Sequence, residues 1–356
     1  MAVTVLLPPS SVPTTRPATA LDGTTRARAE SFLHDWVNQD GRVVRRDQGG
    51  DTVSEGQAYG MLLALALGDH ARFDAIWTWT RTHLQRPDGS LAWIWRDGAV
   101  RDPQPAADAD ADTATALLGA GATWHDDALR RQGMRVSTAL LQSSTVASAP
   151  GRLLAGGPWA VRRGNGPANV DPDYLVAGTA SAFAAATGEA GWRAVATGTS
   201  DMQRALLRAT ALPPDWVSAP ASGGVAAVRP SGAPGTSEAP QYGLSAPRLF
   251  IRLAASCSAT DRALAAHAST AAMRPNAVAI RTLSDSDVVS WHNPITAVGA
   301  AAIDTARGDS PAAGRALDAA AAQNKQSPTY YGAAWLALGS VLLRSNRLGS
   351  CAGERT

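Results

Sequence analysis

One carboxylate stands at the start of an apolar helical segment. Residues 52–61 read Thr-Val-Ser-Glu-Gly-Gln-Ala-Tyr-Gly-Met, and Leu and Ala alternate after them, so Glu55 falls in the first turn of the helix. A carboxyl group buried beside apolar neighbours is disfavoured as an anion, and its pKa rises. A carboxyl that keeps its proton near neutral pH can act as a general acid. The alternative is a capping box, in which Thr52 caps the helix and Glu55 reaches back to it.

A second acidic cluster precedes another helix of small residues. Asp108, Asp110 and Asp112 alternate with alanine just before the small-residue segment 113–123. Carboxylates are favoured at a helix N-terminus, where amide donors and the helix dipole are positive, and for Asp112 we adopt this capping role in a solvated loop. A calcium loop is a further alternative, but its glycine and its closing glutamate are missing. We therefore expect no metal and no cofactor.

The two acidic stretches resemble those of glycoside hydrolase family 8, a group of bacterial endo-β-1,4-glucanases and cellulases. Residues 54–61 are similar to the family pattern S-E-G-x-x-Y-G-M, whose glutamate is the general acid. Residues 106–124 are similar to the pattern A-[ST]-D-[AG]-D, which continues through small residues to an aromatic one. The resemblance implies that Glu55 is the acid, that Asp108 holds the sugar at the cleavage point, and that Asp110 supports it. Two positions of residues 106–124 differ from the family pattern, but neither is acidic in the pattern, so no carboxylate is lost.

Weaker matches follow in the same order along the chain. Residues 91–95 resemble A-W-[RK]-W, residues 171–174 (Asp-Pro-Asp-Tyr) resemble N-P-S-Y, residues 212–216 resemble P-D-W, and residues 330–332 resemble a tyrosine pair near the family's end. The resemblance implies that sugar is bound by Tyr59, Trp93, Trp95, Asp110, Tyr174, Trp216, Arg248, Tyr330 and Tyr331. It covers roughly residues 25–350.

One departure affects the chemistry directly. The family places its general base, an aspartate, in a segment similar to Y-D-A-x-R, and the best match is Leu-Ser-Ala-Pro-Arg at residues 244–248. Ser245 therefore stands at the position of the base. Serine cannot accept a proton from water at neutral pH without a base of its own. An inverting glycosidase needs a second carboxylate about 6.5–9.5 Å from the acid.

Three explanations for Ser245 stay open. The chain could be a weak or inactive relative that binds glycan, or the serine could be a recent or engineered substitution. Alternatively, another carboxylate takes over, the candidates being Asp108, Asp171, Asp173, Asp215 and Glu238.

Other chemistries find little support in the sequence. Ser245 sits in no G-x-S-x-G turn, no phosphate-binding G-x-x-x-x-G-K pattern occurs, and we expect His292 to be structural. A remaining alternative is an unrelated helical toroid, such as a prenyl cyclase, in which aspartates bind magnesium diphosphate. Insensitivity of the activity to chelators would exclude it.

The elements that must position these residues are almost all helical. Apolar periodicity predicts about a dozen helices and hardly any strands. Helical hairpins of this size cannot bury their own apolar faces and must close on each other, which predicts an all-α (α/α)6 barrel. The Ala-, Pro-, Gly- and Ser-rich segment 217–241 should be an ordered loop or a mobile lid. Besides the segments that start at Glu55 and after Asp69, we expect helices at 26–37 (capped by Thr24 or Thr25), 110–123, 126–143, 172–187, 189–210, 243–257, 260–270, 294–306, 310–323 and 329–345.

The 356 residues are nearly half apolar and carry a formal net charge of only +2, so a sizeable core is possible. We expect a flexible lead-in at residues 1–22, one catalytic domain at 23–350 and a tail at 351–356. The eleven Trp exceed the nine Phe and Tyr together, as suits stacking on sugar rings, although core packing explains most of them. Cys257 and Cys351 are the two cysteines; one disulfide and two unpaired thiols remain alternatives.

Composition also limits partners and location. No basic run suggests nucleic acid, and no apolar run reaches the roughly 18 residues of a membrane span. The first residues lack the positive region of a clear signal peptide, while the resemblance implies secretion. We therefore interpret the chain as a secreted, monomeric, endo-acting glycosidase. It would cleave a β-1,4-glucan polysaccharide or oligosaccharide with inversion, with Glu55, Asp108 and the Ser245 position at its centre.

Overall fold

The structure is a computed structural model that describes residues 19–161, 166–229 and 239–348. Within these ranges the chain forms twelve α-helices, as the apolar periodicity predicts. They are α1 (Gly23–Trp36), α2 (Ser54–Leu67), α3 (His70–His83), α4 (Ala107–Thr123), α5 (Asp127–Ser144), α6 (Ala177–Thr187), α7 (Ala190–Ala209), α8 (Ala246–Ala254), α9 (Ala259–Ala266), α10 (Pro294–Ala306), α11 (Ser310–Gln326) and α12 (Tyr330–Arg344).

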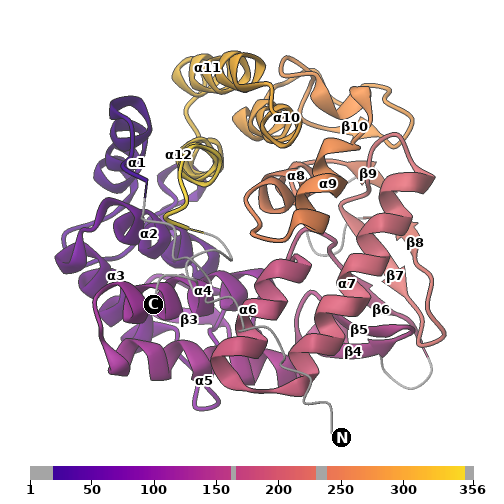
Figure 1. Ribbon diagram of the computed structural model, residues 1–356. Helices are drawn as coiled ribbons and strands as arrows, with labels where there is room; N and C mark the ends of the chain where they lie inside the picture. The colour runs from indigo at the N-terminus through magenta and orange to yellow at the C-terminus, as the bar shows by residue number, and fades with distance from the viewer. Residues whose placement is uncertain (1–18, 162–165, 230–238, 349–356) are drawn as a thin grey trace, which may run out of the picture.

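The helices form an (α/α)6 barrel, which confirms the predicted fold class. Figure 1 shows α2, α4, α8, α10 and α12 around the middle of the ring, with α1, α3, α5 and α11 outside them. The inner helices α2, α4 and α10 are buried along most of their length. The outer helices α1, α3 and α11 bury only one face.

Small residues let the inner helices approach closely. A Cβ atom at Gly339 of α12 would meet Val298 of α10 at 2.2 Å, and one at Gly299 of α10 would meet Pro247 of α8 at 2.9 Å. Real Cβ atoms do not come this close, so these glycines permit the spacing of three neighbouring inner helices.

The connections between helices contain more strand than the sequence predicts. Each strand has only two to four residues, too few to show an alternating pattern. The strands form four small antiparallel sheets: β1 (Thr52–Val53), β2 (Ile94–Arg96) and β3 (Ala99–Asp102); β4 (Thr145–Ser148) and β5 (Gly151–Leu154); β6 (Ala168–Val170), β7 (Trp216–Ala219) and β8 (Ala226–Val228); and β9 (Gln241–Tyr242) with β10 (Arg281–Thr282).

The predicted caps of the first two helices are wrong. Asp22, rather than Thr24 or Thr25, caps α1, because its carboxylate accepts from the Thr25 amide. The N-cap of α2 is Val53, which makes no side-chain cap. Thr52 belongs to β1, where its hydroxyl donates to a backbone carbonyl and accepts from an arginine. Glu55 is therefore not part of a capping box.

Three predicted helix starts also shift, and each shift matters for the site. Helix α4 begins at Ala107, so the acidic cluster lies inside the helix rather than in a loop before it. Helix α6 begins five residues later than predicted, which leaves residues 171–174 in a turn. Helix α8 begins at Ala246 with Ser245 as its N-cap residue.

Some predictions fall partly outside the described residues. Strands β7 and β8 take up part of the predicted loop 217–241, whereas Glu238 lies outside the described ranges. Cys257 is disulfide-bonded, while Cys351 and the tail lie outside those ranges, as does most of the lead-in. Among the helices that the structure describes, none combines the length and apolarity needed to cross a membrane.

Candidate active site

A cavity of about 850 Å³ brings the predicted acid and its partners together. It is lined by the first turns of α2 and α4, the residue before α8, the β1–β2–β3 sheet and the loops near β6 and β7. Its charged, hydroxyl and aromatic lining residues include Arg45, Asp51, Ser54, Glu55, Trp93, Arg96, Asp102, Asp108, Trp159, Tyr174, Trp216 and Ser245.

Arg248 of α8 links the acidic groups of the site. Its Nη1 atom lies 3.5 Å from Glu55 Oε2 and 3.2 Å from Asp108 Oδ2. Its Nε and Nη2 atoms contact the two carboxylate oxygens of Asp173 at 2.8 and 3.0 Å. Asp171 is more distant, at 3.8 Å. One buried guanidinium therefore faces four carboxyl groups that come from three separate parts of the chain.

The surroundings of Glu55 favour its protonated form. Burial, followed by repulsion from Asp108, raises its pKa from 4.5 to about 7, while Arg248 and Arg45 oppose the rise. The side chain is still 23% exposed, because it faces the cavity. Glu55 thus combines access to a ligand with a proton at neutral pH, which a general acid requires.

The three alternating aspartates of α4 have three different surroundings. Asp108 lines the cavity, and burial is the main cause that raises its pKa. Asp110 faces away from the cavity and accepts a hydrogen bond from the Leu91 amide, so it ties the loop before β2 to α4. Asp112 forms a two-point ion pair with Arg252. The capping role in a solvated loop expected for Asp112 is wrong, because helix α4 starts earlier and buries it.

The remaining base candidates are occupied by other contacts. Asp215 accepts hydrogen bonds from the backbone amides of Gly243 and Ala246 and from Gln241. It thereby holds the turn that carries Ser245, and burial raises its pKa to about 6. Asp171 and Asp173 are buried beside Arg248 and do not line the cavity.

The predicted sugar-stacking residues divide into two groups. Trp93, Tyr174 and Trp216 line the cavity. Trp95 instead packs edge-on against Trp79 and beneath the Arg42 guanidinium, outside the cavity lining. Within β2, Ile94 and Arg96 line the cavity and Trp95 lies between them on the other face, since neighbouring residues of a strand alternate; Trp93 precedes the strand.

The other three predicted tyrosines, Tyr59, Tyr330 and Tyr331, do not line the cavity. Tyr59 and Tyr330 are buried, and Tyr59 contacts Arg248 Nη1 through its hydroxyl at 3.4 Å. Tyr331 donates to the carbonyl of Leu244, next to Ser245. Tyr59 thus supports Arg248, and Tyr331 supports the turn before α8.

An arginine cluster that the sequence does not predict lies at one end of the cavity. Asp51 is fully buried and accepts two hydrogen bonds from Arg45, at 2.7 and 2.8 Å, and one from Arg96, at 2.8 Å. The three Arg and two Asp of residues 42–51 are a weak signal for this pairing. Trp159 was also missed. It is 38% exposed and lies 5.9 Å from Trp216, measured between ring centroids.

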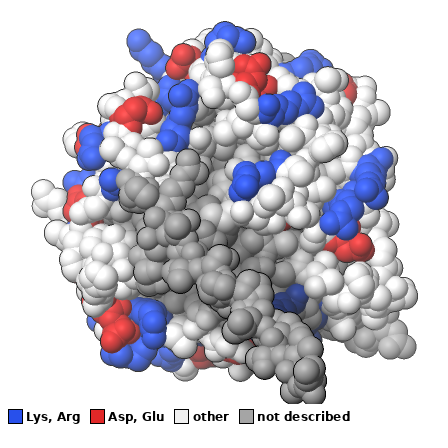
Figure 2. Space-filling view, in the orientation of Figure 1, with Lys and Arg blue, Asp and Glu red and all other residues white. Residues whose placement is uncertain are grey.

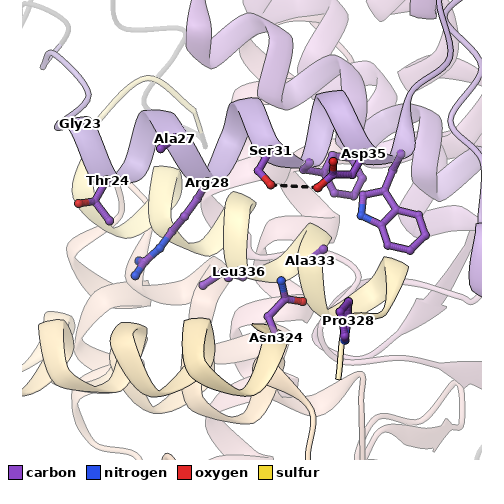
Figure 3. Close-up of a pocket in the computed structure, with 12 residues that line it drawn as sticks. Gly23, Thr24, Ala27, Arg28, Ser31, Asp35, Asn324, Pro328, Ala333 and Leu336 are labelled. Atoms are coloured by element: carbon purple, nitrogen blue, oxygen red, sulfur yellow. Dashed lines mark hydrogen bonds between the residues drawn. The ribbon is translucent and has the colours of Figure 1, made fainter. Parts of the chain in front are cut away.

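A second cavity, of about 640 Å³, lies apart from these residues, between α1, α11 and α12. Figure 3 shows Arg28, Ser31 and Asp35 of α1 on one side of it and Leu336 of α12 on the other. It contains no carboxylate pair and none of the predicted site residues. On the face drawn in Figure 2, basic and acidic side chains are interspersed rather than gathered by sign. No cluster of His, Cys, Asp and Glu among the described residues could hold a metal ion.

Comparison with known proteins identifies curated endoglucanases that match part of this chain. An endoglucanase of Pseudomonas fluorescens is 30% identical over 184 residues, 49% of this chain and 46% of the relative. An endoglucanase of Xanthomonas axonopodis is 34% identical over 200 residues, 52% of this chain and 50% of the relative. The matched segments thus span about half of the length of these curated relatives.

Solved structures match over most of the chain. The endo-beta-1,4-glucanase CMCax from Acetobacter xylinum superposes with a TM-score of 0.72 and 25% identity, over 90% of this chain and 97% of the other. A beta-1,3-1,4-glucanase from Paenibacillus gives a TM-score of 0.76 at 19% identity, over 93% and 91% of the two chains, which shows the fold alone. The model of the glycosyl hydrolases family 8 matches residues 18–345. This match excludes the diphosphate-binding toroid, and the chain belongs to glycosyl hydrolases family 8.

Proposed function

We propose that this chain cleaves β-1,4-linked glucan internally and with inversion, and that Glu55 is its general acid. The observation that carries the proposal is the cavity-facing carboxyl of Glu55, whose pKa is raised to about 7. Proton donation to the glycosidic oxygen requires such a group. Membership of the family and the names of its glucanase relatives support a glucan as substrate.

The other residues would bind and orient the sugar. Asp108 reaches the cavity from the first turn of α4 and is held by Arg248, so its carboxylate can accept hydrogen bonds from ring hydroxyls at the cleavage point. Trp93, Trp216 and Tyr174 offer flat faces for stacking. No metal or organic cofactor is part of this proposal.

Activation of water is the step for which the site is least equipped. Ser245 holds no carboxylate, and Asp215, Asp171 and Asp173 are engaged elsewhere. Asp108 shares the Nη1 atom of Arg248 with Glu55. This leaves little room between the two for the sugar and water that separate acid from base by roughly 6.5–9.5 Å. These contacts favour a second candidate function, a glycan-binding relative with weak or no catalysis.

Release of reducing ends from carboxymethylcellulose tests the enzymatic proposal. Glu55→Gln keeps the size of the side chain but removes the proton donor, so we expect activity to fall by at least about 10². A fall in viscosity that precedes the release of reducing ends indicates internal cleavage. Binding of a cello-oligosaccharide, measured by calorimetry, is the control and should persist in E55Q. Unchanged activity in E55Q would contradict the assignment of the acid.

The same assays separate the two candidate functions. Cleavage by the natural protein, with the α-anomer seen first by NMR, supports an inverting enzyme. Binding without any release, together with cleavage by Ser245→Asp variants, supports the impaired relative. Neither binding nor release would overturn both.

A further inference from the structure

The guanidinium of Arg248 has two edges with different partners. The Nη1 atom faces the cavity side and contacts Glu55, Asp108 and the hydroxyl of Tyr59. On the Nε–Nη2 edge, Nη2 donates a hydrogen bond to Asp173 Oδ2 at 3.0 Å, and Nε lies 2.8 Å from Asp173 Oδ1 as an ion-pair contact. A two-point contact between a guanidinium and a carboxylate fixes the orientation of the arginine as well as its charge. Asp173 thus determines where Nη1 points.

Ser245 contacts Arg248 Nη2, the nitrogen that Asp173 also contacts. Arg248 Nη2 is 3.0 Å from Asp173 Oδ2 and 3.3 Å from Ser245 Oγ. Ser245 lines the cavity, whereas Asp173 is only 1% exposed and does not. Ser245 is also the N-cap residue of α8, a position where aspartate is well accommodated. A carboxylate could therefore reach Arg248 from either side, and in this chain it comes from the buried side.

We propose that Asp173 and Ser245 are a reciprocal exchange, in which Asp173 is the positioning residue that replaces a cavity-side carboxylate at position 245. The inference rests on the proposed function and deepens it, because it explains how the site keeps Arg248 oriented without an acid at 245. The family resemblance implies the same exchange, because residues 171–174 resemble N-P-S-Y with Asp173 at the serine, and residues 244–248 resemble Y-D-A-x-R with Ser245 at the aspartate.

The electrostatics of the pocket make the two carboxylates mutually exclusive. Burial and the neighbouring Asp173 raise the pKa of Asp171 well above its ordinary value. Asp171 is also the more distant carboxyl, at 3.8 Å from Arg248 against 2.8 and 3.0 Å for Asp173. A second carboxylate at position 245 would share the Nη2 atom with Asp173. Two like charges that share one partner disfavour each other. Ser245→Asp should therefore be tolerated better once Asp173 is removed.

A double-mutant cycle in thermal unfolding tests this exclusion on the full chain. Asp173→Ser leaves a buried arginine without its partner, and we expect Tm to fall by roughly 6–10 °C. Adding Ser245→Asp should recover at least about half of that loss. Ser245→Asp in the natural protein should leave Tm unchanged or lower it. Additive effects of the two substitutions would overturn the proposal.

Asp112→Ser is the matched control. Asp112 also makes a two-point ion pair with an arginine of α8, Arg252, so its loss leaves a similar unpaired guanidinium. Ser245 makes no contact with Arg252, and Ser245→Asp should not rescue this variant. Rescue of both variants alike would show a general gain from aspartate at the start of α8, and the exchange would then be wrong.

The pH dependence of kcat/KM distinguishes positioning from mere stability. The charged and titratable groups that face Glu55 are Arg45, Tyr59, Asp108, Asp112, Arg248, Tyr330 and Tyr331. Asp173→Ser leaves the charge of Arg248 less offset, which should lower the pKa of Glu55 and move the alkaline limb down by roughly one unit. The double variant D173S/S245D should return the limb toward its original place and raise kcat/KM on the order of 10² above the natural protein. If the alkaline limb of the kcat/KM profile stayed at the same pH in D173S, the positioning role of Asp173 would be contradicted.

The two readouts separate this inference from the proposed function. The unfolding cycle needs no turnover, so it decides the exchange even if no variant cleaves glucan. Cleavage by the natural protein together with additive unfolding effects would keep the function and reject the exchange.

Discussion

At the scale of single residues, Glu55 should make stability depend on pH. Its pKa is about 7 in the folded chain against an ordinary value of 4.5, so the folded state holds this proton to higher pH than the unfolded state does. The contribution is fully present below about pH 4.5 and is lost as pH rises through 7. The natural protein should therefore lose stability relative to E55Q between pH 5 and 8, by up to about 1 kcal/mol per pH unit.

Thermal unfolding of the two proteins across that pH range measures the difference directly. Asp215 and Asp171 also have raised pKa values but are present in both proteins. Asp108 repels Glu55, so the comparison reports Glu55 together with its effect on Asp108. A difference in Tm that stays constant with pH would mean that Glu55 is ionised throughout.

The residue types of the site were predictable, but their contacts were not. The apolar stretch behind Glu55 predicted its burial, and the side chain is in fact partly buried, at 23% exposed. The clustered aspartates marked α4 as the second acidic segment. Asp112 was misassigned because a carboxylate at a helix start and one inside the helix look alike in sequence. Its partner Arg252 lies 140 residues away. The role proposed for Asp173 likewise depends on its contact with Arg248, and no local sequence pattern shows that contact.

At the scale of elements, the buried ion pairs of Asp51 hold the β1–β2–β3 sheet to the loop before it. Burial alone would raise the pKa of Asp51, but hydrogen bonds from Arg45 and Arg96 hold it below its ordinary value. Asp51→Asn keeps the shape and removes the charge that the two arginines share. We expect the free energy of unfolding to fall by about 3 kcal/mol, as for a broken buried pair.

Denaturant unfolding measures this loss, and the same sheet supplies a control. Asp97 pairs with Arg101 at 2.9 Å, but both side chains are at least half exposed. Asp97→Asn should change stability by less than about 1 kcal/mol. Equal effects of D51N and D97N would show that burial does not strengthen the Asp51 cluster.

The helices were predictable as elements because each has an apolar face repeated over several turns. Helix α10 matches its predicted range at both ends, where Asn293 and a following proline mark the start. The short strands were not predictable, since two to four residues contain no period. The start of α2 was misread for the same reason, because Thr52 acts through β1 and not through the helix.

At the scale of the whole molecule, the cavity is assembled from segments that are distant in sequence. Trp93 comes from the connection after α3, Trp159 from the short helical turn Pro158–Ala160, and Trp216 from β7. The barrel brings them to one end, beside Glu55 on α2. Trp159 was not predictable, because a lone tryptophan in an irregular connection has no pattern to distinguish a binding surface from core.

Trp159 should bind sugar rings at the edge of this cavity. It is 38% exposed and packs at a tilt against Trp216, so one face of its ring remains open to a ligand. Trp159→Ala should weaken binding of a long cello-oligosaccharide about fivefold, as expected for a loss of about 1 kcal/mol. Trp291 is 46% exposed and does not line the cavity, so Trp291→Ala is the matched control. Calorimetry in the E55Q background measures both without turnover, and equal affinities for W159A and W291A would place the glycan elsewhere on the molecule.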